Sequence, residues 1–175
     1  MFGIIGGCLF LFIDEAIQMF SDQPSLTPVW IGYLLFALGG WLLKRDERVT
    51  DPGIRYALVS ACCSFFCLIE HLFYARQSII SMMTEAVALP IVSTLMLHHA
   101  GKGLIELENR YGCDWHGRWI RIISIYVNLS FAGIHFAVFP LVVFVIANCI
   151  VAWGFMGVCI VLTIRFWWKR SQKRS

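Results

Sequence analysis

Long apolar segments separated by short polar ones make up most of this chain, and the longest of them runs from Leu141 to Trp168. Its strongly polar members are Asn148, Thr163 and Arg165. About 20 apolar residues, each adding about 1.5 Å to an α-helix, cover the hydrocarbon core of a bilayer. The segment therefore predicts a membrane-spanning helix.

Turn-forming residues divide the rest of the chain into apolar segments of similar length. Pro24 and Pro28 mark one break, Pro52-Gly53 a second, and Pro140 another. We expect an all-α fold, a bundle of about six transmembrane helices in a single domain over 1–175. The predicted spans are about 1–20, 28–43, 54–75, 79–98, 119–138 and 141–168.

Local features refine this expectation. Pro90 lies inside the fourth predicted span, where a proline kinks a helix or frees an upstream carbonyl. Between the fourth and fifth spans, Leu104 to Glu108 is expected to form a short helix at the membrane interface. In the first span, Gly3 and Gly7 have the spacing that lets another helix approach closely.

Basic residues gather at alternate ends of the predicted spans. With both termini in the cytoplasm, the 14 lysines and arginines divide into thirteen on the cytoplasmic side and Arg76 outside. Cytoplasmic loops of membrane proteins carry such an excess of cations, so we expect both termini to be cytoplasmic. The cytoplasmic set is Lys44, Arg45, Arg48, Arg55, Lys102, Arg110, Arg118, Arg121, Arg165, Lys169, Arg170, Lys173 and Arg174.

The composition agrees with a membrane protein. Apolar residues make up 59% of the chain and charged residues 14%, against about 45–50% and about 25% in soluble domains. The net charge of +3 comes from clusters at span ends, which argues against nucleic-acid binding. The seven cysteines lie mostly in apolar segments and do not form a disulfide framework. We expect an integral protein of a plasma membrane or a bacterial inner membrane.

Ionisable residues within spans are costly, so each one is a candidate functional residue. Counted along the helices, these residues all fall in the outer half of the bilayer, and Arg76 lies at its outer edge. The alternative is that ragged span ends leave most of them among headgroups, with Glu85 alone inside the membrane. The candidate binding residues are Asp14, Glu15, Glu70, His71, Glu85, His135 and Arg76.

Two groups of residues suggest metal chemistry. His71 and His135 fall at matched depth, as two axial haem ligands on facing helices would. The zinc-type ligands are His98, His99, Cys113 and His116, all at the cytoplasmic side, in a spacing that matches no standard site. The sequence identifies no cofactor.

Three functions fit this pattern. The first is a small transporter or channel-like protein that handles protons, cations or a small polar solute through an outer polar cavity. The second is a membrane-embedded enzyme that depends on a metal or haem. The third is a non-catalytic subunit or immunity-type protein that binds a partner in the bilayer.

The lipid bilayer itself is the expected partner in every case. A homo-oligomer or membership of a membrane complex is also expected, because small residues offer faces for close helix packing. These residues are Gly32, Gly39, Gly40, Gly154 and Gly157.

Overall fold

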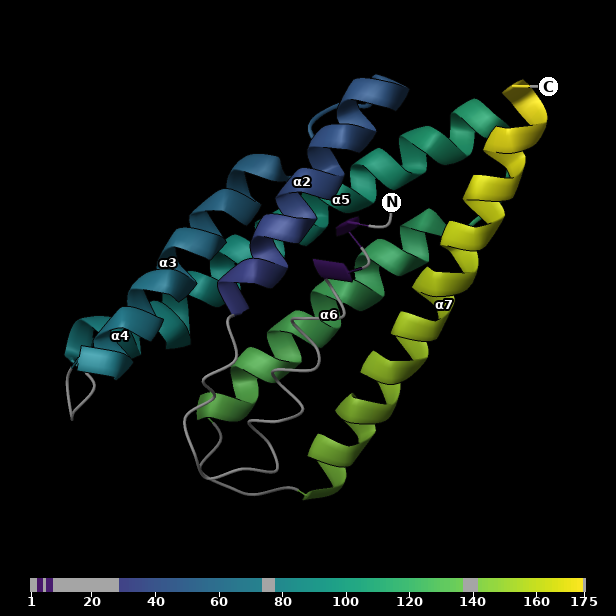
Figure 1. The fold of residues 1–175 in the computed structure, drawn as a ribbon. Coiled ribbons are helices and arrows are strands. Elements are labelled where there is room, and N and C mark those ends of the chain that lie inside the picture. The colour runs from purple at the N-terminus through teal and green to yellow at the C-terminus, as the bar shows by residue number, and fades with distance from the viewer. Residues whose placement is uncertain (1–2, 5, 8–28, 74–77, 137–141, 175) are drawn as a thin grey trace.

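The computed structural model describes residues 3–4, 6–7, 29–73, 78–136 and 142–174, and for parts of the last two helices it describes the backbone alone. Regular secondary structure in these ranges is entirely helical, which confirms the all-α expectation (Figure 1). The elements are α2 (Val29–Glu47), α3 (Ile54–Phe73), α4 (Ile79–Met83), the π-helical turn η1 (Thr84–Ala88), α5 (Leu89–Tyr111), α6 (Gly117–Phe136) and α7 (Val142–Arg174).

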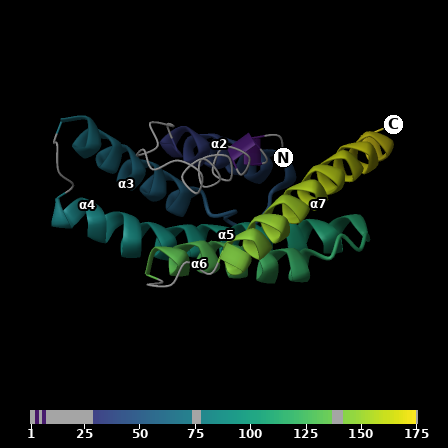
Figure 2. The same ribbon diagram turned by 90° about the horizontal axis from the view of Figure 1, so that it is seen from below.

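The helices form an antiparallel bundle. In Figure 1, α2, α5 and α7 run in one direction, and α3 and α6 run in the other. Seen from below, α2 and α3 make one layer, α4, α5 and α6 make a second, and α7 crosses obliquely beside them (Figure 2). Helices that follow each other in sequence pack against each other.

The helices differ from the predicted spans mainly at the end of the bundle that carries the basic residues. The expected interfacial helix from Leu104 to Glu108 is wrong, because α5 continues without a break to Tyr111. Leu107 is completely buried there, so packing holds this part of α5 against its neighbours. At the same end, α2 extends to Glu47 and α7 continues through the basic tail to Arg174.

The helix around Pro90 shows how the chain adapts to a proline. The residues directly before Leu89 belong to η1, where the Leu89 amide donates to the carbonyl of Thr84, five residues earlier. A π-turn accommodates an irregular hydrogen-bond ladder and widens the helix locally. The upstream disturbance that Pro90 predicts is therefore present, as a π-turn that includes Glu85.

Two buried clusters hold the bundle together. The first lies where α2, α3 and α5 meet, and small alanines of α3 allow the larger side chains of α2 to approach. The second lies at the end of the bundle that carries the basic residues, and it includes side chains of α7. The first contains Tyr33, Phe36, Ala37, Ala57, Ala61 and Met96. The second contains Leu43, Val49, Leu107, Trp115, Leu162 and Phe166.

Glycines let the start of the chain pack closely on α2. A Cβ on Gly3 would lie 2.8 Å from the α-carbon of Gly39, and one on Gly7 would lie 2.6 Å from the carbonyl oxygen of Gly32. The close approach expected from the Gly3–Gly7 spacing is confirmed, and it occurs within one chain. The rest of the first predicted span, like the predicted break at Pro140, lies outside the described residues.

The remaining glycines of the expected packing faces differ from each other. Gly40 packs against the side chains of Pro52 and Ile54, within the chain. On α7, a Cβ added to Gly154 or Gly157 would meet no atom of the described residues within 4 Å. The close-packing faces on α2 are therefore used by the chain itself, whereas the one on α7 meets none of the described residues.

Two helical segments of the described chain are long and apolar enough to cross a membrane, Ile54–Phe73 and Ile79–Tyr111. Buried residues make up 22% and 17% of their apolar windows. A core helix of a soluble protein would be mostly buried, whereas these expose large apolar side chains such as Phe73 and Ile80. This exposed apolar surface supports membrane association.

Candidate functional site

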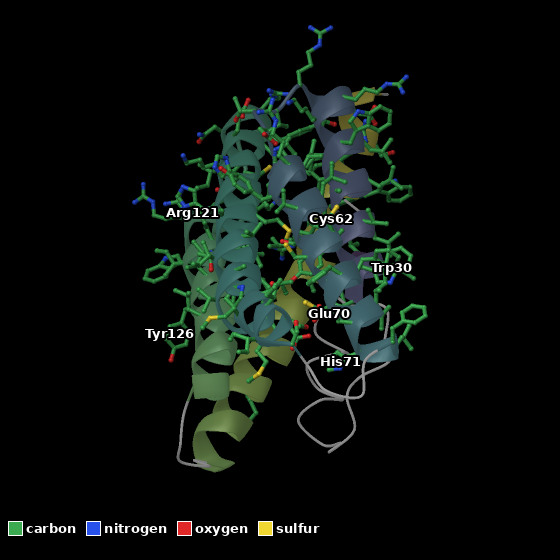
Figure 3. The ribbon with its side chains drawn as sticks, turned by 90° about the vertical axis from the view of Figure 1, so that its left-hand side faces the viewer. Trp30, Cys62, Glu70, His71, Arg121 and Tyr126 are labelled. Carbon is green, nitrogen blue, oxygen red and sulfur yellow. The ribbon has the colours of Figure 1, made fainter. Side chains whose placement is uncertain are left out.

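The end of α3 carries two of the predicted binding residues side by side. Glu70 and His71 occupy the last turn of α3. This turn lies at one end of the bundle, and most of the nitrogen-bearing side chains gather at the other end (Figure 3). Because α4 begins at Ile79 and runs antiparallel to α3, its first turns lie beside these residues. The fold therefore places the start of one helix against the acidic end of another.

His71 and Glu85 meet across this helix pair. Nε2 of His71 lies 3.6 Å from Oε1 of Glu85, and the side chains are 26% and 42% exposed. Glu85 belongs to the π-turn η1, so the widened turn bears one member of the pair. Predicted residues from two antiparallel helices are thus in contact, at the distance of an ion pair when the imidazole is protonated.

Glu70 is fixed by a serine at the start of α4. The Ser78 hydroxyl donates to Oε2 of Glu70 at 2.5 Å and accepts from the Ser81 amide at 3.1 Å. Ser78 is the N-cap of α4, a position where a hydroxyl satisfies a free backbone amide. One side chain therefore both starts α4 and ties it to Glu70.

A buried layer lies directly beneath this group. The Cys67 thiol donates to the carbonyl of Ser81 at 4.0 Å, and both residues are buried. The Ser81 hydroxyl has no hydrogen-bond partner among the described residues. Cys67, one turn before Glu70 on α3, thus packs α3 against α4 below the carboxylates.

The other predicted binding residues are not placed. Asp14, Glu15 and Arg76 lie outside the described residues, and His135 falls in a part of α6 where the backbone alone is described. The haem hypothesis, which needs His71 and His135 together, and the role of Arg76 at the cavity mouth therefore stay predictions.

The weaker metal candidates lie at the other end of the bundle. The rings of His98 and His99 are 5.6 Å apart, and His99 also packs on Tyr56 at 5.1 Å. Cys113 donates to a backbone carbonyl, and His116 lies 3.1 Å from the carboxylate of Asp114. Among the residues described, no three His, Cys, Asp or Glu side chains form a group that could hold a metal ion.

The structure also contains a polar network between α5 and α6 that the sequence analysis did not identify. The Asn128 amide donates to the Thr94 hydroxyl at 2.9 Å and to the Pro90 carbonyl at 3.2 Å, and its oxygen accepts from Ser93 at 3.0 Å. Thr94 donates to the same Pro90 carbonyl at 2.7 Å, and the Ser93 hydroxyl, which has a single proton to donate, lies 3.1 Å from it as an alternative acceptor. Every polar group of the Asn128 side chain is used, so the network joins two helices within the apolar part of the bundle.

A second group of paired charges closes the basic end. Glu47 is 8% exposed, accepts a hydrogen bond from the Tyr111 hydroxyl at 3.0 Å, and lies 3.0 Å from Nε of Arg170. Arg170 also donates to Asp46 at 3.0 Å. Burial, and next the hydrogen bond to Glu47, raise the pKa of Tyr111. These interactions join the ends of α2, α5 and α7.

The connections at this end are fixed by two carboxylates of α5. Glu106 accepts from the hydroxyl and amide of Thr50 at 2.7 and 2.9 Å, which lowers the pKa of Glu106. Glu108 accepts from the amides of Trp115 and Gly117, so it caps the start of α6. The predicted cytoplasmic loops are therefore held to α5.

No protein-family model, curated protein or solved structure matches the chain.

Proposed function

We propose that the chain is a polytopic membrane protein, with about six spans and both termini in the cytoplasm. The antiparallel arrangement supports this topology, because the ends of α2, α5 and α7 share one side with the starts of α3 and α6. Nearly all the basic residues belong to that side, as the distribution of cations around membrane proteins favours. The membrane is a plasma membrane or a bacterial inner membrane.

Within this topology, we infer that the protein is a small transporter or channel-like protein for protons or cations. The observation that carries this proposal is the contact between His71 and Glu85 beside Glu70. Two carboxylates and one imidazole have a net negative charge when all are ionised. Such a group in a weakly polar setting attracts a proton or a cation, and releases it when the helices expose the group to water.

The π-turn allows the His71–Glu85 pair to change its geometry when a proton or cation binds. A π-turn has a less regular hydrogen-bond ladder than an α-helix and is often found at functional sites. Glu85 sits in this turn, while Pro90 prevents the ladder from becoming regular directly below it. Movement of Glu85 toward or away from His71 then requires adjustment of one helical turn.

Ion flux through reconstituted protein tests the proposal. Purified protein is placed in liposomes that contain a pH-sensitive dye, and proton entry is followed under a potassium diffusion potential. We expect Glu85→Gln, which keeps the shape of the side chain and removes its charge, to reduce the flux at least tenfold. Asp114→Asn, in the loop before α6 and 75% exposed in its side chain, is the matched control and keeps normal flux.

The same assay with Na⁺ or K⁺ and a matching dye covers the cation alternative. A wild-type protein that carries neither protons nor these cations would contradict the proposal. Unchanged flux in Glu85→Gln would contradict the role of the pair. Those results would favour a non-catalytic subunit, which co-purification with a partner would then identify. A metal- or haem-dependent enzyme would instead show bound metal or an absorption band in the purified protein.

A further inference from the structure

Some basic side chains at the inner end of the bundle form an ion pair with a carboxylate, and others do not. Arg170 and Arg110 each lie within 4.0 Å of a carboxylate oxygen. Lys102 of α5 and Arg121 of α6 have no such carboxylate in the part of the chain that the structure describes. Their charge is therefore available to a ligand.

The position of Arg121 depends on a glycine of the neighbouring helix. A Cβ on Gly101 would lie 2.6 Å from Cβ and 2.8 Å from Cδ of Arg121, so the arginine stem lies directly on the α5 backbone. Figure 3 shows Arg121 at the flank of the bundle, in the half opposite Glu70 and His71. The packed stem holds the guanidinium at the seam between α5 and α6.

His98 and Lys102 bring further nitrogen atoms to this seam. They are one turn apart on α5, so they share a flank of that helix. Lys102 directly follows Gly101, on which the Arg121 stem packs, so the two cations lie near each other and near His98. Groups from two helices thus make one positive site, which we call the α5–α6 basic site: His98, Lys102 and Arg121.

The depth of the α5–α6 basic site indicates what it meets. About 20 residues from Ile79 cross the hydrocarbon core, so Lys102 lies at the level of the headgroups. On α6, Trp119 and Ile122 are 63% and 48% exposed, as expected of residues at and just below a membrane interface. A lipid with its acyl chains along the exposed apolar side of α6 has its phosphate at the level of Lys102 and Arg121.

We propose that Lys102 and Arg121, with His98 beside them, bind the phosphate of an anionic phospholipid in the inner leaflet. Arginine forms paired hydrogen bonds to phosphate oxygens, and lysine adds a point charge. Basic sites between transmembrane helices on the cytoplasmic side are suited to such headgroups. The inference rests on the proposed membrane topology and is independent of ion flux through the Glu85 pair.

Lipid titration of the purified, full-length protein tests this site. Phosphatidylglycerol is added to protein in nanodiscs of phosphatidylcholine, and bound lipid is counted by native mass spectrometry. We expect the double variant Lys102→Gln/Arg121→Gln to bind phosphatidylglycerol about tenfold more weakly than the wild type. The matched control Lys44→Gln/Arg45→Gln removes two cations from the end of α2 and stays within about twofold of the wild type.

A charge-preserving variant separates binding from folding. Lys102→Arg/Arg121→Lys keeps both charges and is expected to bind within about threefold of the wild type, and Glu85→Gln to bind as the wild type does. Equal losses in the two double variants that remove charge would show diffuse attraction and overturn the proposal. Equal binding of phosphatidylcholine, or displacement of the lipid by inorganic phosphate at millimolar concentration, would also overturn it.

Discussion

At the residue scale, single side chains decide how closely the helices approach. Gly39 is the clearest case, because a Cβ added there would lie 2.7 Å from the carbonyl carbon of Gly3 and closer still to the amide nitrogen of Ile4. No rotamer change relieves a collision with backbone atoms, so a larger residue at this position must push the helices apart. By comparison, a Cβ added to Gly154 on α7 would meet no atom of the described residues within 4 Å.

We predict that Gly39→Leu lowers the free energy of unfolding by at least about 2 kcal/mol, the usual cost of overpacking a close contact. Thermal unfolding in detergent, followed by circular dichroism, measures the change. Gly154→Leu is the matched control, and is expected to be neutral or slightly stabilising because leucine favours helix more than glycine does. An equal loss in both variants would contradict the packing described for Gly39.

Glu106 provides a prediction about pH. Its pKa is lowered in the folded protein, first by the Thr50 hydroxyl and then by the Thr50 amide. A carboxyl with a lowered folded pKa stabilises the fold above its ordinary value of 4.5. That contribution is lost as the pH falls through the lower, folded value.

We therefore expect wild type to be more stable than Glu106→Gln at pH 7, with the two thermal midpoints converging as the pH falls from 4.5 through the lower, folded pKa of Glu106. Thr50→Val removes the hydroxyl and keeps the amide, so it is expected to give an intermediate difference at pH 7. A difference between wild type and Glu106→Gln that persists unchanged at pH 3 would show that the carboxylate hydrogen bonds are not its source.

At the element scale, the Asn128 network is the polar connection between α5 and α6 in the apolar part of the described bundle. Interhelical hydrogen bonds of this kind contribute about 0.5–1.5 kcal/mol in membrane proteins. Because Asn128 and Thr94 bond to each other and share the Pro90 carbonyl, the energies of their substitutions are coupled.

A double-mutant cycle measures that coupling. We predict that Asn128→Leu and Thr94→Val each destabilise the protein, and that together they cost less than the sum by about 0.5–1 kcal/mol. Asn109→Leu, at an exposed position of α5, is the control and is expected to change stability by less than about 0.5 kcal/mol. Strict additivity of Asn128→Leu and Thr94→Val would contradict the shared network.

At the scale of the whole molecule, hydrophobic patterning predicts the order and type of the helices well. The ends of α3 and α6 fall within two residues of the predicted spans, because turn-forming residues on either side of an apolar segment limit where its helix can begin and end. The end of α5 is less predictable, because Leu107 is buried by side chains from α2 and α7 that are distant in sequence.

The candidate site is predictable only in part. Glu70, His71 and Glu85 stand out because ionisable residues are rare in apolar segments. Depth counting places them at one level, whereas the contact between His71 and Glu85 depends on the rotation of two helices, which a sequence pattern leaves open. Asn128 carries no formal charge and does not stand out in the sequence. Its role becomes visible through its hydrogen bonds to Ser93 and Thr94.

The central claim is that the two ends of the bundle lie on opposite sides of a membrane, with the His71–Glu85 end outside. Single cysteines in a cysteine-free chain test it in intact cells with a membrane-impermeant thiol reagent. We predict that a cysteine replacing Phe73, the last residue of α3, reacts in intact cells, and that one replacing Asp114 reacts only after the cells are opened. Reaction of both cysteines in intact cells, or of Asp114→Cys alone, would contradict the claim.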